Sequence, residues 1–174
     1  MSRTRGESGH WSDSSGIALT AASDIGHIDG IRTLFREYAL TLNVDLCFQH
    51  FDQELETLPG EYALPRGCLL LATVAGEMAG CCALRALDTS DYANACEMKR
   101  LYVRPAYRGL GLGRRLSEAI LDHARQAGFE CVLLDTLDDM EAARALYDDL
   151  GFEDIPPYYY NPIAGAHYLK AALK

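Results

Sequence analysis

The chain has 174 residues, of which 49% are hydrophobic and 24% charged, values that fit one soluble globular domain with its own core. Its formal net charge of −9 disfavours nucleic acids and anionic membranes as partners, because the average field of the protein would repel their phosphates. No apolar run reaches the roughly 18–20 residues of a membrane span, and the amino terminus lacks the apolar segment of a secretory signal. We therefore expect a soluble, cytoplasmic protein.

Six cysteines raise the question of disulfides or a metal site, but their spacing points to neither. No two have C-x-x-C spacing, no histidine and cysteine cluster has zinc spacing, and most lie inside apolar runs. Small buried thiols of this kind are typical of a reducing compartment. We expect reduced thiols and no metal at Cys47, Cys68, Cys81, Cys82, Cys96 and Cys131.

Residues 1–14 are rich in serine, glycine and charge and predict a disordered tail, whereas residues 15–174 show no linker and predict one domain. Ser23 or Asp24 can cap a first helix, whose apolar residues recur at helical spacing as far as Tyr38. The elements expected in the first half are a strand at Ile17–Thr20, this helix, a helix over Asp45–Leu58, and strands at Leu69–Val74 and Met78–Leu84 around a turn at Ala75–Glu77.

The second half alternates strands with helices. Gly128 and Gly151 follow two amphipathic stretches and predict where these helices end, and an Asp138/Glu141 capping box predicts the start of the second. A meander followed by this alternation indicates a mixed α/β sheet of the α+β type. The elements expected here are a strand at Ala95–Val103, a helix over Leu112–Ala127, a strand at Cys131–Leu134, a helix over Met140–Leu150 and a strand at Ala166–Ala171.

A glycine-rich segment joins the strand at Ala95–Val103 to the helix that follows. Its glycines let backbone N–H groups face one concavity, at the positive end of the helix dipole. Arg114 and Arg115 lie in the first turn, where a cation costs about 0.3–1 kcal/mol against the dipole, and a bound polyanion would reverse that sign. The sequence predicts a diphosphate site at Arg108, Gly109, Leu110, Gly111, Leu112, Gly113 and Arg114.

Other nucleotide-binding motifs do not fit this segment. The third glycine of a dinucleotide-binding G-x-G-x-x-G motif is absent, and so is the Gly-Lys followed by Ser or Thr of a Walker A loop. A flexible glycine turn with incidental arginines is the remaining alternative. The preceding strand and the following amphipathic helix favour the anion site over that alternative.

The stretch EMKRLYVRPAYRGLGLGRRL, residues 97–116, resembles the acetyl-CoA signature of the Gcn5-related N-acetyltransferase (GNAT) superfamily, in which R/Q-x-x-G-x-G/A follows a strand ending in V-x-P. The stretch ARALYDDLGF, residues 143–152, is similar to the fourth-helix signature of that family. Many members carry Asn early in this helix as a cofactor contact, where this chain has Met140. The matching positions are Val103, Pro105, Arg108, Gly111 and Gly113, then Ala143, Leu146, Tyr147, Gly151 and Phe152.

This resemblance implies a mixed central sheet of about six to seven strands, about four flanking helices and a splayed central strand pair. It implies an N-acetyltransferase that moves the acetyl group of acetyl-CoA directly to a primary amine in a ternary complex. Small amines, amino acids, drugs and peptide N-termini are all possible acceptors, and the short chain favours a small molecule. Homodimers are common among similar proteins. A non-catalytic acyl-CoA-binding sensor or interaction domain on the same fold is the alternative function.

The strand at Ala95–Val103 breaks the period-2 alternation of side chains. Cys96 and Met98 share one parity and Leu101 and Val103 the other, so a β-bulge near Lys99-Arg100 would return all four to one face. A two-faced buried strand without a bulge is the alternative. The resemblance implies such a bulge, which splays the strand so that pantetheine lies beside it. It also implies cofactor contacts at Leu101, Tyr102 and Val103, with freed N–H groups at Leu101 and Val103.

Two residues are expected to act on protons. Tyr147 lies on the inner stripe of its helix, and by resemblance its phenol meets the coenzyme A sulfur as the acid; a core tyrosine is the alternative. Glu97 is the one carboxylate inside the apolar part of its strand, and by resemblance it draws the amine proton, often through water, so that either Glu97 or a water is the base. Burial would raise its pKa and favour that task. An ion pair with Lys99 or a surface position is the alternative.

Tyr158–Asn161 could wall the acceptor pocket or form a structural corner.

Overall fold

Strands of branched and apolar residues build one mixed sheet in the computed structural model, which describes residues 4–5, 10–12, 15–42, 45–46 and 50–174, with side chains from residue 15 onward. In sheet order the strands are β1 (Thr4–Arg5), β2 (His10–Ser12), β3 (Ile17–Ala21), β4 (Cys68–Val74), β5 (Glu77–Ala86), β6 (Ala95–Val103), β7 (Cys131–Leu137), β9 (Ala166–Ala172) and β8 (Glu153–Asp154). Within the described part of the chain, every neighbouring pair is antiparallel except β6 and β7, which are parallel.

The strands agree closely with those predicted. β6 has the predicted bounds, and the turn at Ala75 and Gly76 joins β4 to β5 with both residues at positive φ (51° and 84°), as a two-residue hairpin requires. The sequence did not predict β8, nor the short strands β1 and β2 inside the expected tail. Residues 1–3, 6–9 and 13–14 of that tail lie outside the described residues, so its disorder stays a prediction there.

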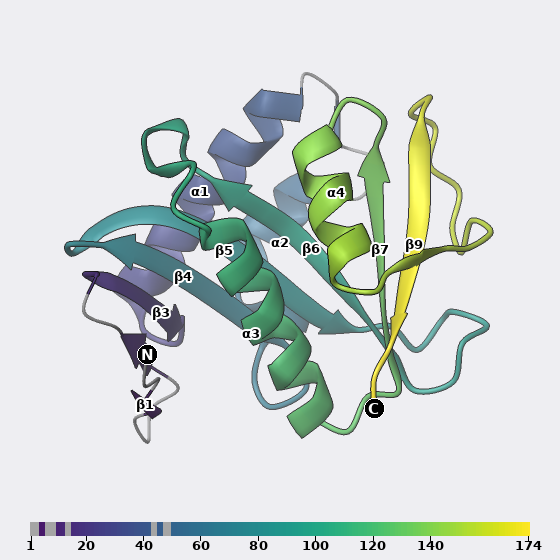
Figure 1. Ribbon diagram of the computed structural model, residues 1–174, viewed down its shortest axis with the longest axis horizontal. Helices are drawn as coiled ribbons and strands as arrows, with labels where there is room; N and C mark the ends of the chain where they lie inside the picture. The colour runs from purple at the N-terminus through teal and green to yellow at the C-terminus, as the bar shows by residue number, and fades with distance from the viewer. Residues whose placement is uncertain (1–3, 6–9, 13–14, 43–44, 47–49) are drawn as a thin grey trace.

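Two pairs of helices cover the two faces of the sheet, α1 (Ile25–Leu42) and α2 (Phe51–Thr57) on one face and α3 (Leu112–Gln126) and α4 (Glu141–Asp149) on the other (Figure 1). The Asp24 carboxylate accepts a hydrogen bond from the His27 N–H at 2.8 Å, which confirms the predicted cap of α1. α2 begins at Phe51, later than the predicted Asp45.

The predicted capping box of α4 is wrong. Met140 occupies the N-cap position, and no side chain there bonds to the helix. The Asp138 carboxylate instead contacts the Nε2 atom of His167, on β9. Because β9 pairs with β7, this contact ties the loop before α4 to the sheet, and the N-cap of α4 has no side-chain hydrogen bond.

Strand β6 contains the bulge that its side-chain pattern predicts. Arg100 has a φ of 61°, and the register with β5 passes from Ala83↔Lys99 to Cys81↔Tyr102, so two residues of β6 stand opposite one of β5. As a result, the apolar residues on both sides of the bulge pack into the core beneath α3 and α4. These residues are Cys96, Met98, Leu101 and Val103.

The bulge coincides with the place where the sheet opens. β6 and β7 pair at Ala95↔Cys131, Cys96↔Val132 and Glu97↔Leu133, and no further pair between them is found in the described part of the chain. Figure 1 shows the two strands together at one end and apart at the other, with α4 in front of the opening. The predicted splayed central pair is therefore β6 and β7.

The described cysteines are free and buried, as predicted: Cys68, Cys81, Cys82, Cys96 and Cys131. Burial raises the pKa of the Cys68 and Cys96 thiols to about 12, which keeps both protonated at neutral pH. Cys47 lies outside the described residues.

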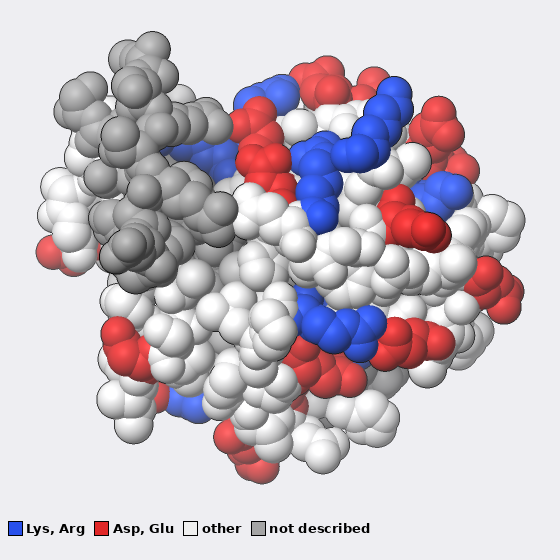
Figure 2. Space-filling view, turned by 90° about the horizontal axis from the view of Figure 1, so that it is seen from below, with Lys and Arg blue, Asp and Glu red and all other residues white. Residues whose placement is uncertain are grey.

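Acidic and basic side chains are mixed over the described part of the face seen in Figure 2, so the negative net charge of the chain is not gathered there into one patch. None of the helices in the described ranges combines the length and apolar character needed to cross a membrane.

The bulge residue Arg100 provides a test of how the sheet is held open. Its side chain is 3% exposed and bonds to Glu54 of α2 at 3.0 Å. We expect Arg100→Ala to lower the free energy of unfolding by about 3–5 kcal/mol, because it leaves a partly buried carboxylate unpaired. Urea denaturation measures the difference. The matched control is Arg125→Ala, whose ion pair with Asp122 is exposed (43% and 61%) and worth about 0–1 kcal/mol. Equal costs for the two variants would contradict a structural role for the bulge.

Candidate functional site

The glycine-rich segment leads from β6 into α3 through a short 3₁₀ turn at Pro105–Tyr107. Gly109 and Gly111 have φ angles of 85° and 77°, in the left-handed region that favours glycine. Arg115 makes the first intrahelical hydrogen bond of α3, to the Gly111 carbonyl at 3.1 Å. The N–H groups of residues 112–114 therefore precede the hydrogen-bond ladder of α3, at the positive end of its dipole and with no acidic residue in the first turn.

Gly113 is the one glycine of this loop that the backbone does not require. Its φ is not in the left-handed region, and a Cβ at this position would meet only the Leu146 side chain at 3.7 Å, an ordinary contact. A residue other than glycine would fit the fold at this position. The absence of a side chain instead leaves the N–H groups of the first turn open to a ligand.

Two arginines of the predicted diphosphate site have weak or local partners. Arg108 donates from Nε to the Val103 carbonyl at 3.1 Å, which keeps its guanidinium beside the end of β6. Arg114 pairs with Asp149 of α4 at 2.8 Å, but both side chains are largely exposed (45% and 63%). An exposed pair of this kind contributes about 0–1 kcal/mol, so an incoming polyanion can replace the carboxylate.

A narrow cleft of about 40 Å³ lies where β6 and β7 separate. Met98–Leu101 of β6 form one wall and Asp135–Leu137 of β7 the other, and Met140 and Tyr147 also line it. The cleft thus brings Tyr147 and the second half of β6 together, as predicted. Met140, the departure from the family pattern, lies here as well.

The direction of the backbone N–H groups determines which hydrogen-bond donors of β6 point into this cleft. The Arg104 N–H donates to the Ala79 carbonyl on the β5 side at 2.8 Å. Because N–H groups alternate along a strand, those of Leu101 and Val103 point to the opposite side, where the pairing with β7 has ended. Tyr102 differs from these two residues, since its ring packs against Tyr38 on the α1 face at a centroid distance of 6.4 Å.

Tyr147 is buried, with 5% of its surface exposed, and its ring packs edge-on against Phe152 at 5.6 Å between centroids. Burial raises its pKa well above the ordinary tyrosine value. The phenol therefore stays protonated at neutral pH and can donate a proton or a hydrogen bond into the cleft that it lines.

A larger pocket of about 520 Å³ opens on the α2 side of the sheet. Leu58 and Leu87 contribute apolar surface, and Tyr158 and Tyr159 contribute aromatic walls, whereas Tyr160 is 84% exposed and does not line this pocket. Its ionisable lining comes from α2, the segment after α2, β5, β6 and the carboxyl-terminal segment: His50, Glu54, Glu61, Tyr62, Arg85, Glu97, Lys99, Tyr158 and Tyr159.

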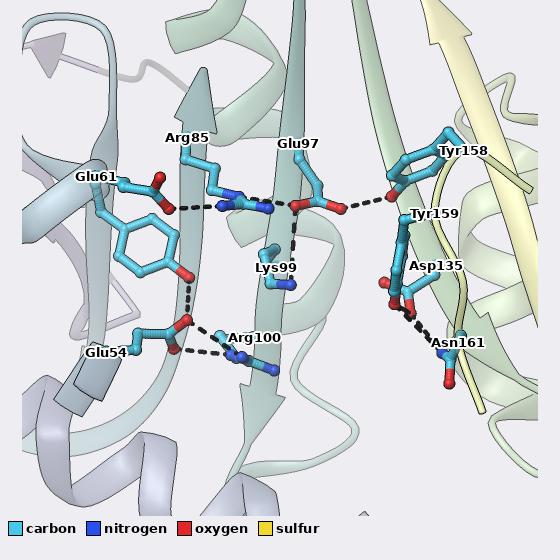
Figure 3. A network of polar contacts seen from close by, with 11 residues as sticks. Glu54, Glu61, Arg85, Glu97, Lys99, Arg100, Asp135, Tyr158, Tyr159 and Asn161 are labelled. Carbon is cyan, nitrogen blue, oxygen red and sulfur yellow. Dashed lines mark hydrogen bonds and ion pairs between the residues drawn. The ribbon is translucent and has the colours of Figure 1, made fainter. Parts of the chain in front are cut away.

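Glu97 stands at the centre of a chain of polar contacts in this pocket (Figure 3). Its side chain is 1% exposed. One carboxylate oxygen accepts from Arg85 Nε at 2.8 Å and lies 3.8 Å from Lys99 Nζ, and the other accepts from the Tyr158 hydroxyl at 2.6 Å. Arg85 extends the chain to Glu61 at 2.6 Å. The ion pair with Lys99, given as the alternative above, is thus present.

The expected rise in the pKa of Glu97 is wrong. Burial alone would raise it, but the charges of Lys99 and Arg85 and the Tyr158 hydrogen bond outweigh burial and lower the pKa below its ordinary value. Glu97 is therefore ionised at neutral pH with both oxygens engaged. Arg85, the residue that sequence reasoning missed, had one visible signal: it is a lone charge near the end of the apolar strand β5.

Asp135 of β7 anchors the segment that follows the aromatic run. It accepts a hydrogen bond from the Tyr159 hydroxyl and another from the Asn161 side chain at 3.1 Å. Asn161 lines the narrow cleft while Tyr158 and Tyr159 line the larger pocket, so this segment borders both cavities. Within the described ranges no group of three or more His, Cys, Asp or Glu side chains could hold a metal ion.

Comparison with known proteins gives a consistent result. A family model described as "Acetyltransferase (GNAT) family" matches residues 29–152. An uncharacterized N-acetyltransferase of Schizosaccharomyces pombe is 37% identical over 157 residues, covering 90% of this chain and 94% of the relative. An acetyltransferase structure from Streptococcus agalactiae has a TM-score of 0.72 at 21% identity and covers 91% of this chain and 99% of the other. A Salmonella typhimurium structure described with its cofactor acetyl-CoA has a TM-score of 0.70 at 20% identity, covering 91% and 95%.

The Glu97 network predicts a pH dependence of stability. The pKa of Glu97 in the folded state is below its ordinary value of 4.5. The ionised carboxylate therefore contributes fully to the free energy of unfolding above that pH, and this contribution is lost as the pH falls below it. We expect Glu97→Gln to cost about 1.5–3 kcal/mol at pH 7, by loss of charged hydrogen bonds, and progressively less below pH 4.5. Urea denaturation at several pH values measures this. Glu61→Gln is the control, since this carboxylate on the same arginine is 71% exposed; a cost independent of pH would contradict the assignment.

Proposed function

We propose, because the chain belongs to the acetyltransferase (GNAT) family, that it transfers the acetyl group of acetyl-CoA to the primary amine of a small molecule, directly and in a ternary complex. The observation that carries this proposal is the opening between β6 and β7 at the Arg100 bulge. Backbone donors of β6 and the phenol of Tyr147 lie at this opening, and the larger polar pocket borders it at Lys99.

The loop before α3 supports acetyl-CoA as the donor. Coenzyme A carries a diphosphate, and the amides at the start of α3 with Arg108 and Arg114 supply donors and positive charge for it in a chain that is otherwise acidic. The cleft between β6 and β7 is narrow, which suits the unbranched cysteamine and β-alanine end of the pantetheine arm. The acetyl-CoA described with the Salmonella typhimurium structure is in line with this assignment.

The larger pocket supports a small molecule as the acceptor. Its volume of about 520 Å³ lies within the range of about 300–1,000 Å³ that is usual for small-molecule sites. Glu54, Glu61 and Glu97 line it against Arg85 and Lys99, so carboxylates outnumber cations and favour a cationic amine. The buried free thiols support a reducing, cytoplasmic location. The homodimer suggested by the resemblance stays a prediction.

In the proposed reaction each residue has a defined task. The thioester supplies an activated acetyl group. The N–H of Leu101 or Val103 donates to the oxygen on which negative charge develops, Tyr147 gives its proton to the departing sulfur, and Glu97 draws the ammonium group into the pocket as an ionised carboxylate. Screening a panel of amines with acetyl-CoA by mass spectrometry tests the function. The absence of transfer to every amine would reject it.

The diphosphate site can be tested separately from catalysis. We expect acetyl-CoA to raise the melting temperature, and acetyl-pantetheine, which lacks the diphosphate, to have little effect at the same concentration. Arg108→Ala and Arg114→Ala should each weaken acetyl-CoA about 10-fold in calorimetric titration, the loss of one charged hydrogen bond. Arg125→Ala, at the other end of α3, is the matched control. If acetyl-pantetheine stabilises the protein as well as acetyl-CoA does, the loop is not the anchor.

Tyr147→Phe tests the acid. Removing the hydroxyl should leave acetyl-CoA binding unchanged and lower kcat and kcat/KM together by about 100-fold or more, because the proton is needed only as the sulfur departs. Steady-state kinetics with the best acceptor measures both constants. Tyr92→Phe, on the loop before β6, is the control. Normal turnover in Tyr147→Phe would remove this residue from the reaction.

A further inference from the structure

The two cavities described above meet at a single side chain. The narrow cleft and the larger pocket both border β6, and of the described residues Lys99 is the one that lines both. Lys99 directly precedes the bulge residue Arg100, where β6 has already separated from β7. An amine in the pocket and a thioester in the cleft would therefore react beside Lys99 Nζ.

The surroundings of Lys99 are those of a buried cation. Its side chain is 7% exposed, and its Nζ lies 3.8 Å from a Glu97 oxygen that Arg85 already occupies at 2.8 Å. Burial lowers the pKa of Lys99, and Arg100 and Arg85 lower it further, against the opposing charges of Glu97 and Asp135. The titratable groups that line the two cavities with Lys99 or act on its charge are Glu97 and Arg100 on β6, Arg85 on β5, Asp135 on β7, Tyr38 on α1, His50 and Glu54 at α2, Glu61 and Tyr62 in the 3₁₀ turn after α2, Tyr147 on α4, and Tyr158 and Tyr159 before β9.

We propose that Lys99, in its neutral form, is the catalytic base that takes the proton from the acceptor's ammonium group at the junction of the two cavities. The inference rests on the proposed acetyl transfer and assigns a residue to its proton step. Glu97 becomes a positioning residue: held by Arg85 and Tyr158, it fixes Lys99 Nζ and stabilises the ammonium form that Lys99 acquires.

The protons balance as follows. The acceptor nitrogen loses two protons as it changes from ammonium to amide. The first passes to Lys99 Nζ and then through the pocket to water, which restores the neutral amine. The carbon–sulfur bond breaks as the carbon–nitrogen bond forms, Tyr147 protonates the sulfur, and the second proton of the nitrogen replaces the one that Tyr147 gave.

The other carboxylates of the pocket are poorly placed to accept the first proton. Glu54 is bonded to Arg100 at 3.0 Å and to the Tyr62 hydroxyl at 2.7 Å, and Glu61 lies at the exposed rim on Arg85. Glu97 has both oxygens engaged and a lowered pKa. Proton transfer to any of them would weaken an existing ion pair, whereas transfer to Lys99 creates a positive charge 3.8 Å from the Glu97 carboxylate.

Lys99→Arg is the decisive variant, because it keeps the long cationic side chain but cannot become neutral. We expect kcat/KM at pH 7 to fall about 100-fold or more with an alkylammonium acceptor. With a weakly basic amine that is already neutral at this pH, the loss should be less than about 3-fold, since no base is needed. The stabilisation by acetyl-CoA serves as the control for folding and should be unchanged. Equal losses with both acceptors, or none, would overturn the proposal.

A direct titration needs no turnover. The chain has three lysines, Lys99, Lys170 and Lys174, so lysine labelled with carbon-13 at Cε gives few NMR signals, and the one that disappears in Lys99→Arg belongs to Lys99. We expect this signal to titrate below the ordinary lysine value of about 10.4. In Glu97→Gln its midpoint should move lower still, because an opposing charge is gone. A midpoint at or above the ordinary value overturns the assignment even in an active enzyme.

The outcomes separate the two proposals. If the wild-type protein acetylates amines and Lys99→Arg does so equally well, only the role of Lys99 is wrong. If the wild-type protein binds acetyl-CoA but acetylates no amine, the proposed function fails and the role of Lys99 with it. If Glu97→Gln abolishes transfer at every pH while the midpoint of Lys99 is ordinary, Glu97 itself is the base.

Discussion

A guanidinium whose side chain is 3% exposed can remain in a sheet only where a carboxylate meets it, and Arg100 meets Glu54 through two hydrogen bonds, at 3.0 and 3.2 Å. The rings of Phe51 and Tyr38 lie within 5.1 and 5.9 Å of the guanidinium carbon and complete its environment. This pair holds a residue other than glycine at positive φ in the middle of β6. Because it joins β6 to α2, the bulge, the cleft and the pocket wall formed by α2 depend on the same contact.

Buried charge is balanced locally around this site. Arg85 pairs with Glu97 across the β5–β6 ladder, Tyr158 donates to the other oxygen of Glu97, and Lys99 supplies a second positive charge whenever it is protonated. Such a network is costly to desolvate and stabilises the fold only if every member is satisfied, so packing alone does not explain why it lies in the sheet. Its position in the wall of the larger pocket is in line with the proposed function, since a cationic amine entering that pocket would need fixed charges to replace water.

The parts of the fold that could be predicted are those that depend on the order of residues within one segment of the sequence. The bounds of β6 and its bulge follow from a break in period-2 alternation, and the cap at Asp24 follows from its position before an amphipathic stretch. The errors came from contacts between distant residues. Asp138 meets His167, on a strand 29 residues away, instead of capping α4. The pKa of Glu97 depends on Arg85 and on Tyr158, which lies 61 residues away, and no local pattern relates these three residues.

The same bulge also determines what Lys99 can do. Without the extra residue, β6 would continue its pairing and a lysine at this position would be one more side chain over a closed sheet. With it, the pairing of β6 with β7 ends at Glu97, and the side chain of Lys99 lines both cavities. Arg100 occupies the next position, where its permanent charge is paired with Glu54 at 3.0 Å. Lysine can gain and lose a proton, and Lys99 lies outside that pair, 3.8 Å from Glu97. The order Lys99-Arg100 therefore places a titratable side chain where the two cavities adjoin, and a permanently charged one in the ion pair that holds β6 to α2.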